Sequence, residues 1–501
     1  MENLIKIFNY LSKKILGLPA VKKWLGKHPK IHRQLIERLS TKKFTGLTVT
    51  IFSAAFLFVI YFLFGIIEDY LEHDPLILLD ARIANLLYVI RSATLLRFFY
   101  YVTLFAEPVI IIALTVVIGI LLLINRQRVY IFTLGFALVL GEGLALFGKN
   151  IFQRQRPDLF LRAITEDSFS FPSGHAVAVV LFYGFLAYLI IRNYRSLKIR
   201  IVTISALVLI ISLIDLSRLY LGVHYLSDVF AGNLLGFSVL ILSIGITEWL
   251  ISSRRELHPN KVKIYQILTV LFVTIVLVSI LYHVANPPLN KNKPLTVTKI
   301  NTEDVLSLFD NKKLPRFTET ITGTTQEPIN LIVISPESCF VQSMAHANWD
   351  LAEGISLSST ERLAKTAILN QPYPTAPMTP SFYNAEPNDY GFEKQTDRNS
   401  VRARHHARFW KTNYETPLGT VFVGTISLDT GLKWGITHTI APDIDTERDI
   451  FVSDMTNTGV VSEGKIIPFV SPVLGSNFSG DQFFTNGQAA LLILSSCNTI
   501  K

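Results

Sequence analysis

The sequence predicts an α-helical integral membrane protein followed by a soluble mixed α/β domain. Half of its 501 residues are apolar and only 17% are charged, which is typical of membrane proteins. Apolar runs of membrane-spanning length continue to about residue 285, and beyond residue 295 short alternating apolar runs replace them. The chain therefore divides into a membrane part and a water-exposed part.

Seven apolar runs are long enough to span a bilayer, which takes about 20 mostly apolar residues. The run at 86–99 is too short and is interrupted by arginines, so we interpret it as an interfacial amphipathic helix. The first long run begins only near residue 47 and lacks a small-residue cleavage site, so we expect no cleavable signal peptide. The expected spans are 47–67, 106–124, 129–147, 176–191, 199–216, 229–250 and 264–284.

The placement of lysine and arginine predicts the orientation. Residues 1–45 carry eleven Lys and Arg against Glu2 and Glu37, so the N-terminus should be cytoplasmic. The acidic loop 68–80 should then lie outside, and with seven spans everything after residue 286 lies outside too. Much of the net charge of +9 is therefore topology signal and requires no nucleic acid as a partner.

Shifts in composition predict four segments. A polar linker marked by Pro287 and Pro288 separates the last span from a region of about 200 residues, which is long enough for one globular domain. In that region runs at 331–334, 420–426 and 490–494 predict strands, and 360–369 predicts a helix. The segments are a basic cytoplasmic segment (1–45), a transmembrane domain (46–260), a seventh transmembrane helix (261–286) and an extracytoplasmic C-terminal domain (287–501).

The only two cysteines, Cys339 and Cys497, fall in the region expected outside the cytoplasm. A disulfide between them would suit an oxidising compartment. Two buried thiols agree with the sequence equally well, so both interpretations stay open.

Three short segments at the edges of apolar runs carry the chemistry. They contain three permanent cations, two histidines and a carboxylate four residues after the second histidine. The segments are Lys149-x6-Arg156-Pro157, Pro172-Ser173-Gly174-His175 and Ser217-Arg218-x5-His224-x3-Asp228.

These residue types together predict a site for phosphoryl transfer. His224 and Asp228 share a helix face, so the carboxylate can fix the tautomer of the imidazole and leave its other nitrogen free to attack. His175 begins the helix of the expected span 176–191, where it can act as a general acid beside free backbone N–H groups. Guanidinium and ammonium groups suit the equatorial oxygens of a phosphoryl group, and this chemistry needs chiefly positioning and charge stabilisation. Those cations are Lys149, Arg156 and Arg218.

The three segments resemble the signature motifs of the type 2 phosphatidic acid phosphatase superfamily over about residues 95–250. The resemblance implies His224 as a nucleophile that forms a phosphohistidine, oriented by Asp228, and His175 as the acid that protonates the leaving group and later activates water. It also implies a six-helix phosphatase core, here with one extra transmembrane helix. The phosphate would be held by Lys149, Arg156, Ser173, Gly174 and Arg218.

Other charged residues near the spans receive weaker assignments. Glu142 lies seven residues before Lys149 on the same helix face, and an intramembrane carboxylate is a functional candidate. Asp215 and Glu107 lie near span ends, where water is available. Arg154 and Arg162 we interpret as interfacial arginines without a role in the site.

The C-terminal region has a polar cluster of its own. It could bind a metal or a second phosphate group, or it could be a hydrogen-bonded core cluster. Positions 404, 406 and 408 would project to one face of a strand. The region resembles the LssY C-terminal family, and we expect an accessory binding module. The cluster comprises Arg404, His405, His406, Arg408, Trp410, His438, Asp443, Asp445, Glu447, Arg448 and Asp449.

The sequence thus predicts a lipid phosphatase of a bacterial cytoplasmic membrane, acting on the outer face without a metal or other cofactor. Its expected partners are the bilayer and a lipid phosphate, with no nucleic acid. A phosphotransferase, or a membrane anchor whose C-terminal domain is a binding module, remain as alternatives. Oligomeric state, protein partners and the identity of the lipid do not follow from the residues.

Overall fold

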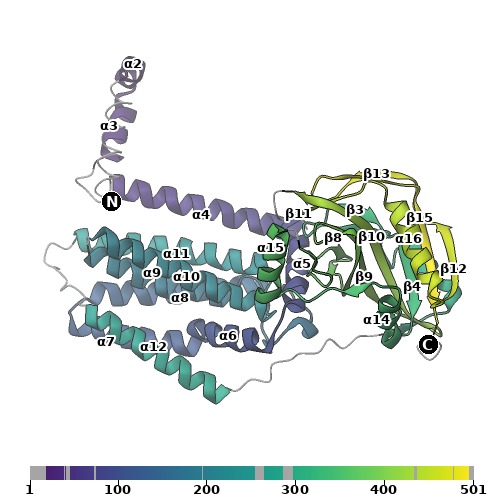
Figure 1. Ribbon diagram of the computed structural model, residues 1–501. Coiled ribbons are helices and arrows are strands. Elements are labelled where there is room, and N and C mark those ends of the chain that lie inside the picture. The colour runs from purple at the N-terminus through teal and green to yellow at the C-terminus, as the bar shows by residue number, and fades with distance from the viewer. Residues whose placement is uncertain are drawn as a thin grey trace. The chain divides into compact units, whose positions relative to one another are not determined.

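The structure is a computed structural model of the chain (Figure 1). It describes residues 18–38, 40, 46–72, 75–194, 196–253, 264–285, 297–369, 371–433, 437–477 and 479–495. These residues form two compact units. The helical unit contains the residues up to 72 together with 93–285, and the C-terminal unit joins Pro75–Ser92 to the residues from 297 onward.

The predicted apolar runs form long helices. Within the described residues, five helices are long and apolar enough to cross a membrane, and a sixth span results if a bent helix pair counts as one. The seventh predicted run forms a helix of 22 residues, of which Phe272–His283 is a shorter apolar stretch. The helices of this unit are α2 (Pro19–Lys27), α3 (Pro29–Arg38), α4 (Leu47–Glu72), α6 (Ala93–Thr103), η1 (Leu104–Ala106), α7 (Pro108–Ile124), α8 (Arg128–Phe152), η2 (Leu159–Leu161), α9 (Gly174–Asn193), α10 (Leu197–Tyr220), α11 (Leu226–Ser253) and α12 (Ile264–Ala285).

The expectation of one interfacial helix at 86–99 is wrong. The chain forms two helices there, α5 (Pro75–Val89) and α6, with a break at Arg91 and Ser92. Helix α6 packs on α10, and with η1 it forms a pair with α7 that is bent by 44°. The bend occurs where Glu107 is extended before Pro108, because proline cannot continue the preceding hydrogen-bond ladder.

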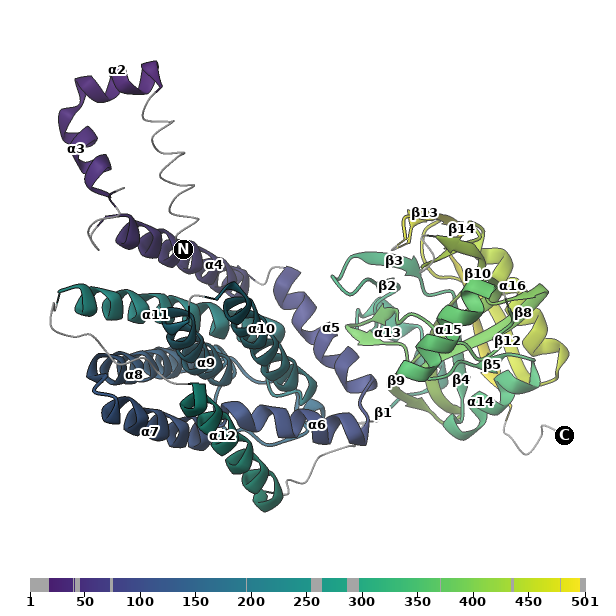
Figure 2. The ribbon, with the colours of Figure 1, turned by 60° about the vertical axis from the view of Figure 1, so that its left-hand side comes forward.

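Helix α9 is the centre of the helical unit, and it contacts α8, α10 and α11 (Figure 2). Glycines allow close approach to α11. A Cβ on Gly184 would lie 2.5 Å from a methyl group of Leu240, and one on Gly236 would lie 2.9 Å from Val180. Because α8 and α10 run toward the end of the bundle at which α9 and α11 begin, the four helix ends that carry the sequence motifs meet there.

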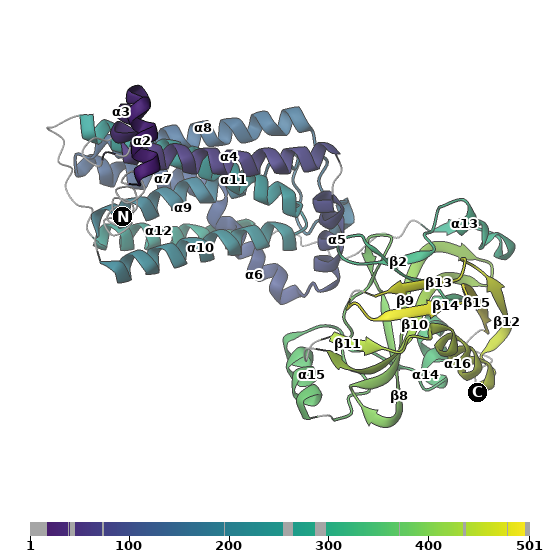
Figure 3. The same ribbon diagram turned by 90° about the horizontal axis from the view of Figure 1, so that it is seen from above.

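The C-terminal unit is built on one large mixed sheet of order β12-β15-β4-β10-β9-β8-β5 (Figure 3). Strand β15 pairs with β4 in parallel. The pairs β12–β15, β4–β10 and β10–β9 are antiparallel. One face packs Phe409 of the sheet against Phe340 of α14 (Glu337–His346) and Phe451 of α16 (Ile444–Asn457). The strands of this path are β4 (Leu331–Ser335), β5 (Asp350–Leu351), β8 (Tyr390–Ser400), β9 (Ala403–Thr416), β10 (Gly419–Lys433), β12 (Val461–Pro468) and β15 (Gln488–Leu494).

Shorter elements complete this unit. Strands β1 (Thr298–Lys299) and β11 (Thr437–Ile440) pair with β9 and β10. Four short strands form a second sheet of order β3-β2-β6-β7, and two form a hairpin. They are β2 (Phe317–Glu319), β3 (Thr325–Pro328), β6 (Phe382–Tyr383), β7 (Glu386–Pro387), β13 (Val473–Ser476) and β14 (Gln482–Thr485), and the remaining helices are η3 (Thr302–Asp304), α13 (Ser307–Asp310) and α15 (Leu357–Leu369).

The predicted strands at 331–334, 420–426 and 490–494 and the predicted helix at 360–369 are confirmed by β4, β10, β15 and α15. Cys339 is buried and disulfide-bonded. The only other cysteine of the sequence, Cys497, lies outside the described residues. The predicted domain boundaries stay predictions, and the packing adds that α5 contacts β7 of the C-terminal unit.

Candidate active site

The three motifs converge at one end of the helical unit. Lys149 lies in the last turn of α8 and Arg156 in the loop that follows. His175 lies in the first turn of α9, and Arg218 in the last turn of α10. His224 and Asp228 flank the start of α11.

His224 and Asp228 are both buried and contact each other. Nδ1 of His224 lies 3.4 Å from Oδ2 of Asp228, and the same oxygen accepts the Tyr225 backbone N–H at 2.8 Å. The other oxygen of Asp228 accepts Arg154 Nη1 at 2.6 Å. The carboxylate is thus held on both sides, with one oxygen against the imidazole.

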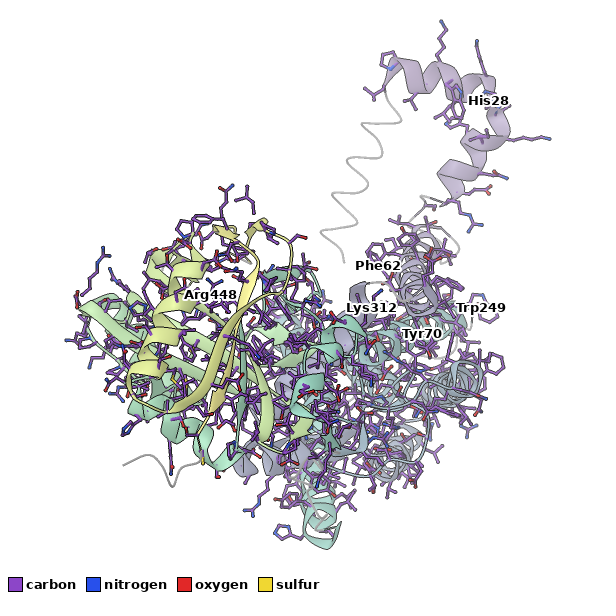
Figure 4. All side chains as sticks on the ribbon, turned by 90° about the vertical axis from the view of Figure 1, so that its right-hand side faces the viewer. His28, Phe62, Tyr70, Trp249, Lys312 and Arg448 are labelled. Carbon is purple, nitrogen blue, oxygen red and sulfur yellow. The ribbon has the colours of Figure 1, made fainter. Side chains whose placement is uncertain are left out.

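Arg154 belongs to this arrangement, so its assignment as an interfacial arginine without a role is wrong. It is 8% exposed, and its guanidinium also donates to Ser227. Two rings enclose it, Tyr225 at 4.4 Å and Tyr70 of α4, labelled in Figure 4, at 5.0 Å from ring centroid to Cζ. Arg162 differs, because the hydrogen bonds that its guanidinium makes go to the backbone carbonyls of residues 156 and 157.

The second nitrogen of His224 faces the cations. Arg156 Nη1 lies 3.3 Å from His224 Nε2, while its main acceptor is the Val223 carbonyl at 2.7 Å. Because a guanidinium can only donate, Nε2 carries the lone pair and Nδ1 carries the proton facing Asp228. Burial, together with the charges of Arg156 and Arg218, holds the pKa of His224 well below its usual value. At neutral pH this histidine is therefore uncharged, with its lone pair directed toward the cations.

Glu166, which the sequence did not single out, occupies the cationic cluster. Its carboxylate lies 2.5 Å from Arg218 Nη2 and 3.6 Å from Arg156 Nη2. Burial opposes its ionisation, but the charges of Arg218 and His175 lower the pKa of Glu166 to about 2. A carboxylate between two guanidiniums stands where the oxygens of a phosphate would be expected. No local pattern could have revealed this residue, because it lies in an aperiodic loop.

The remaining cation contacts tie the loop 153–173 to the helices. Lys149 Nζ donates to Ser168 Oγ at 2.9 Å, and Arg156 Nε donates to the Ser168 carbonyl at 2.6 Å. Arg218 Nη1 donates to Thr103 Oγ1 at 3.0 Å. Burial lowers the pKa of Arg156 to about 10, against the opposing charge of Glu166, so it stays charged at neutral pH.

Ser173 and Gly174 form the start of α9. Ser173 is the N-cap and accepts from the Ala176 N–H, while its own N–H donates to the Asp228 carbonyl at 3.0 Å. A Cβ on Gly174 would meet Glu142 Oε2 at 3.5 Å, an ordinary contact, so close packing by itself does not demand glycine there. The tight approach is at Gly232, where a Cβ would lie 2.5 Å from the Ser173 carbonyl oxygen.

His175 contacts Glu107, a residue to which the sequence gave little weight. Its Nε2 lies 3.4 Å from Glu107 Oε2. Of the other intramembrane carboxylates, Asp215 accepts from Asn233 at 2.6 Å. Glu142 approaches the start of α9 near Gly174 and has no further assigned role.

A pocket of about 680 Å³ adjoins the cluster. Glu107, Glu166 and Arg218 are among its polar and charged lining residues. Apolar side chains line it as well, among them Leu104, Val109, Leu159 and Leu281.

The polar cluster expected in the C-terminal unit splits over two faces of the sheet. His405 faces Glu447 at 2.6 Å, and His406 faces Asp429 at 3.0 Å. Arg448 of α16, labelled in Figure 4, pairs with Asp445 and Asp449. In the part of the chain that the structure describes, no group of three or more His, Cys, Asp or Glu side chains could hold a metal ion. The side chain of His438 lies outside the described ones.

Comparison with known proteins gives two family matches. Residues 129–252 match the family model described as the PAP2 superfamily, and residues 311–489 match the one described as the LssY C-terminus. The match with phosphatidylglycerophosphatase B of Bacillus subtilis is 38% identical over 102 residues, 20% of this chain and 49% of that protein. The chain thus spans about half the length of that curated relative.

Two further relatives are informative. Decaprenylphosphoryl-5-phosphoribose phosphatase of Mycobacterium tuberculosis is 30% identical over 133 residues, 26% of this chain and 68% of that protein. The crystal structure of a transmembrane PAP2 type phosphatidylglycerolphosphate phosphatase from Bacillus subtilis is 26% identical. It covers 41% of this chain and 98% of its own, and its TM-score of 0.34 supports no argument about the fold. From the family model and the curated relatives, the chain belongs to the PAP2 superfamily.

Proposed function

We propose that this protein is a membrane phosphatase that removes a phosphate from a lipid through a phosphohistidine on His224. The observation that supports this most is the accepting Nε2 of a neutral, buried His224 beside Arg156. Lys149 and Arg218 lie in the same cluster, linked to Arg156 through Ser168 and Glu166. Attack on a phosphate needs such a lone pair together with positive charge around the phosphoryl oxygens.

In the first step, His224 Nε2 attacks phosphorus and the bond from phosphorus to the lipid oxygen breaks. Asp228 stabilises the positive charge that develops on the imidazole, and Arg154 keeps that carboxylate in place. His175 donates a proton to the departing alkoxide, and Glu107 orients its ring. The phosphate must displace Glu166 from Arg218 and Arg156.

In the second step, water attacks the phosphohistidine while His175 takes up a proton from it. Free phosphate leaves and His224 returns with its lone pair. Together the two steps consume one water, in the second step, for each phosphate released, which is the balance of a hydrolase. The cations Lys149, Arg156 and Arg218 offset the charge of the equatorial oxygens throughout.

The substrate class is a phosphomonoester or pyrophosphate carried by a lipid. The apolar wall of the 680 Å³ pocket beside Glu166 and Arg218 supports an amphiphilic substrate. The curated relatives named above are phosphatases of phosphatidylglycerophosphate and of a decaprenylphosphoryl sugar phosphate. Candidate substrates are phosphatidic acid, phosphatidylglycerophosphate, undecaprenyl pyrophosphate and a lipid A phosphate.

The experiment is a screen for phosphate release by the purified full-length protein over these four lipids, with and without a chelator. We expect release from at least one lipid, unchanged by the chelator, because the three cations supply the charge stabilisation. A matched set of phosphodiester lipids should release nothing. Failure on every lipid would refute the proposed activity, and loss of release with the chelator would refute the metal-independent mechanism.

We further propose that the protein is a multi-pass protein of a bacterial cytoplasmic membrane, with the site and the C-terminal unit on the extracytoplasmic side. The basic residues of 1–45 support a cytoplasmic N-terminus. The disulfide at Cys339 supports an oxidising compartment for the C-terminal unit. Reporter fusions after residues 196 and 290 should land on opposite sides, and a cytoplasmic signal from both would contradict this topology.

A further inference from the structure

A pocket of about 350 Å³ opens on one face of the large sheet in the C-terminal unit. Its floor contains Arg404, His406 and Arg408 from β9, and Ser427 and Asp429 from β10. The register pairs Ser427 with His406. Alternate residues of a strand point to the same face, so these five side chains form one continuous polar surface.

His406 lies at the centre of this floor, and its neighbours fix its protonation. Arg408 Nη1 lies 2.9 Å from His406 Nε2, and since arginine can only donate, Nε2 accepts and Nδ1 carries the proton. That proton faces Asp429, whose Oδ1 is 3.0 Å away. Ser427 Oγ also lies 2.8 Å from Nε2.

Ser427, His406 and Asp429 share the connectivity of a hydrolytic triad. The resemblance does not extend to function, because Arg408 already occupies the lone pair that would have to take the serine proton. The cluster is therefore arranged for holding a ligand rather than for activating the serine.

Two donors on the floor make no hydrogen bond. Nε of Arg404 and Nε of Arg408 are buried without a hydrogen-bond partner among the described residues, although Asp429 Oδ2 lies 3.6 Å from Arg404 Nε. Arg404 is only 3% exposed, and its Nη1 donates to the fully buried Glu393 at 2.5 Å. Buried donors in native proteins are almost always satisfied, so donors left over at the floor of a pocket indicate an acceptor supplied by a ligand.

The charges of the floor favour an anion. Two guanidiniums, Arg404 and Arg408, face one ionised carboxylate, Asp429. Burial raises the pKa of Glu393 to about 9, against the charge of Arg404, so it is protonated at neutral pH. Burial also raises the pKa of Glu327 at the pocket wall. On the floor itself, Arg404 and Arg408 against Asp429 leave one positive charge in excess.

The rim of the pocket differs from its floor. The carboxylate of Glu319 is paired with Arg82 at 2.5 Å and accepts the Ala385 N–H at 2.6 Å. About half of the other lining residues are apolar, so the pocket as a whole is amphiphilic. The apolar ones include Leu86, Ile321, Leu363, Met378 and Ile440.

We propose that this pocket binds the phosphodiester group of an amphiphilic ligand, with Arg404, Arg408 and Ser427 donating to its oxygens. A phosphodiester carries one negative charge, which matches the excess charge of the floor. Its tetrahedral phosphorus presents oxygens in several directions, as donors from two strands require, whereas a carboxylate presents two in one plane. The volume suits a head group, which can come from a membrane phospholipid or from a soluble glycerophosphodiester.

The test is calorimetric titration of the full-length protein in dodecylmaltoside with dihexanoylphosphatidylglycerol. Arg408→Gln should raise Kd by about tenfold or more, because it removes a charge-assisted donor. Lys411→Gln is the matched control, since Lys411 lies on the same strand and pairs with Glu337 outside the pocket. Ser427→Ala, which changes no charge, should raise Kd by a smaller factor and guards against a folding defect in the arginine variant.

Further titrations distinguish a membrane lipid from a soluble ligand, and a phosphodiester from a carboxylate. Glycerophosphoglycerol is the head group alone. If it binds as tightly as the short-chain lipid, the ligand is a soluble glycerophosphodiester. If it binds more weakly, the ligand is a membrane lipid. Equal affinity for dihexanoylglycerol hemisuccinate, which carries a carboxylate, would overturn the phosphodiester assignment. Identical Kd values for Arg408→Gln and Lys411→Gln, or no binding at all, would overturn the site.

Discussion

Two histidines in this protein stand between a carboxylate and an arginine, and the two units hold them differently. In the helical unit, His224 lies 3.4 Å from Asp228 and 3.3 Å from Arg156, which has a better acceptor in the Val223 carbonyl. In the C-terminal unit, His406 lies 3.0 Å from Asp429, and both Arg408 and Ser427 approach its Nε2 within 2.9 Å. The loosely held nitrogen stays available for attack, and the crowded one does not.

The surroundings of the two histidines differ in charge as well. Around His224, the cations Lys149, Arg156 and Arg218 outnumber the carboxylates that face them, and Glu166 bridges two of the cations. Around His406, the carboxylate of Asp429 offsets one of the two guanidinium charges of Arg404 and Arg408, and the protonated Glu393 offsets none. Three cations beside a free lone pair suit the proposed phosphoryl transfer, whereas a single excess positive charge beside an occupied lone pair suits the proposed binding of an anion.

The strongest test of this contrast is His224→Ala. Losing the attacking nitrogen should lower phosphate release on the order of 10³-fold or more, while the melting temperature stays close to that of the unchanged protein. Phosphate release from the best lipid of the screen measures the effect. His346→Ala, which removes an exposed imidazole from α14, is the control. If His224→Ala released phosphate as fast as the unchanged protein, His224 would not be the nucleophile.

Arg154→Gln tests whether the carboxylate beside His224 depends on its ion pair. Removing one partner of a buried pair leaves Asp228 without compensation, which should cost about 3–5 kcal/mol of stability and reduce kcat. Thermal melting and phosphate release measure both effects. Arg162→Gln, in the same loop, loses only hydrogen bonds to backbone carbonyls and should have a clearly smaller effect. Equal effects of the two variants on stability and kcat would refute a specific role of the Arg154–Asp228 ion pair.

Glu166→Gln tests whether this carboxylate competes with the substrate phosphate. Weakening its hold on Arg218 and Arg156 should lower KM about three- to tenfold, because the phosphate no longer has to displace a charged group. Steady-state kinetics would measure it, with Asp158→Asn as control, because Asp158 is an exposed carboxylate in the same loop that does not line the pocket. A rise in KM would instead mean that Glu166 holds the arginines ready for substrate.

The pH dependence of stability tests the C-terminal unit. The folded-state pKa of Glu393, about 9, lies above the unfolded value near ~4.3, so between these values the folded state binds more protons. Stability should fall as pH rises through this window, by up to ~1.4 kcal/mol per pH unit. Glu393→Gln should flatten that decline in thermal melts at pH 6 to 9. Glu463→Gln, at an exposed site, should keep the slope, and an unchanged slope in Glu393→Gln would refute the buried proton.

Much of the architecture could be read from local patterns. The apolar runs at 47–67 and 129–147 became α4 and α8, and the alternating segment at 420–426 became part of β10. These patterns succeed because helix and strand periodicity depends only on neighbours along the chain. The break between α5 and α6 was missed, because the run at 86–99 is apolar on both sides of Arg91 and Ser92.

The sequence by itself determined five of the seven predicted spans as long apolar helices within the described residues, together with the three motifs and the residue types that suit phosphoryl transfer. Only the tertiary structure decided that Arg154 holds Asp228 while Arg162 does not, and that Glu166 lies between two cations. It also decided that Asp429 faces His406 and that Glu447 faces His405. The physical reason is that an aperiodic loop has no pattern from which its contacts follow. Arg154 and Glu166 lie in such a loop, so their ion pairs with Asp228 and Arg218 form only when the chain folds.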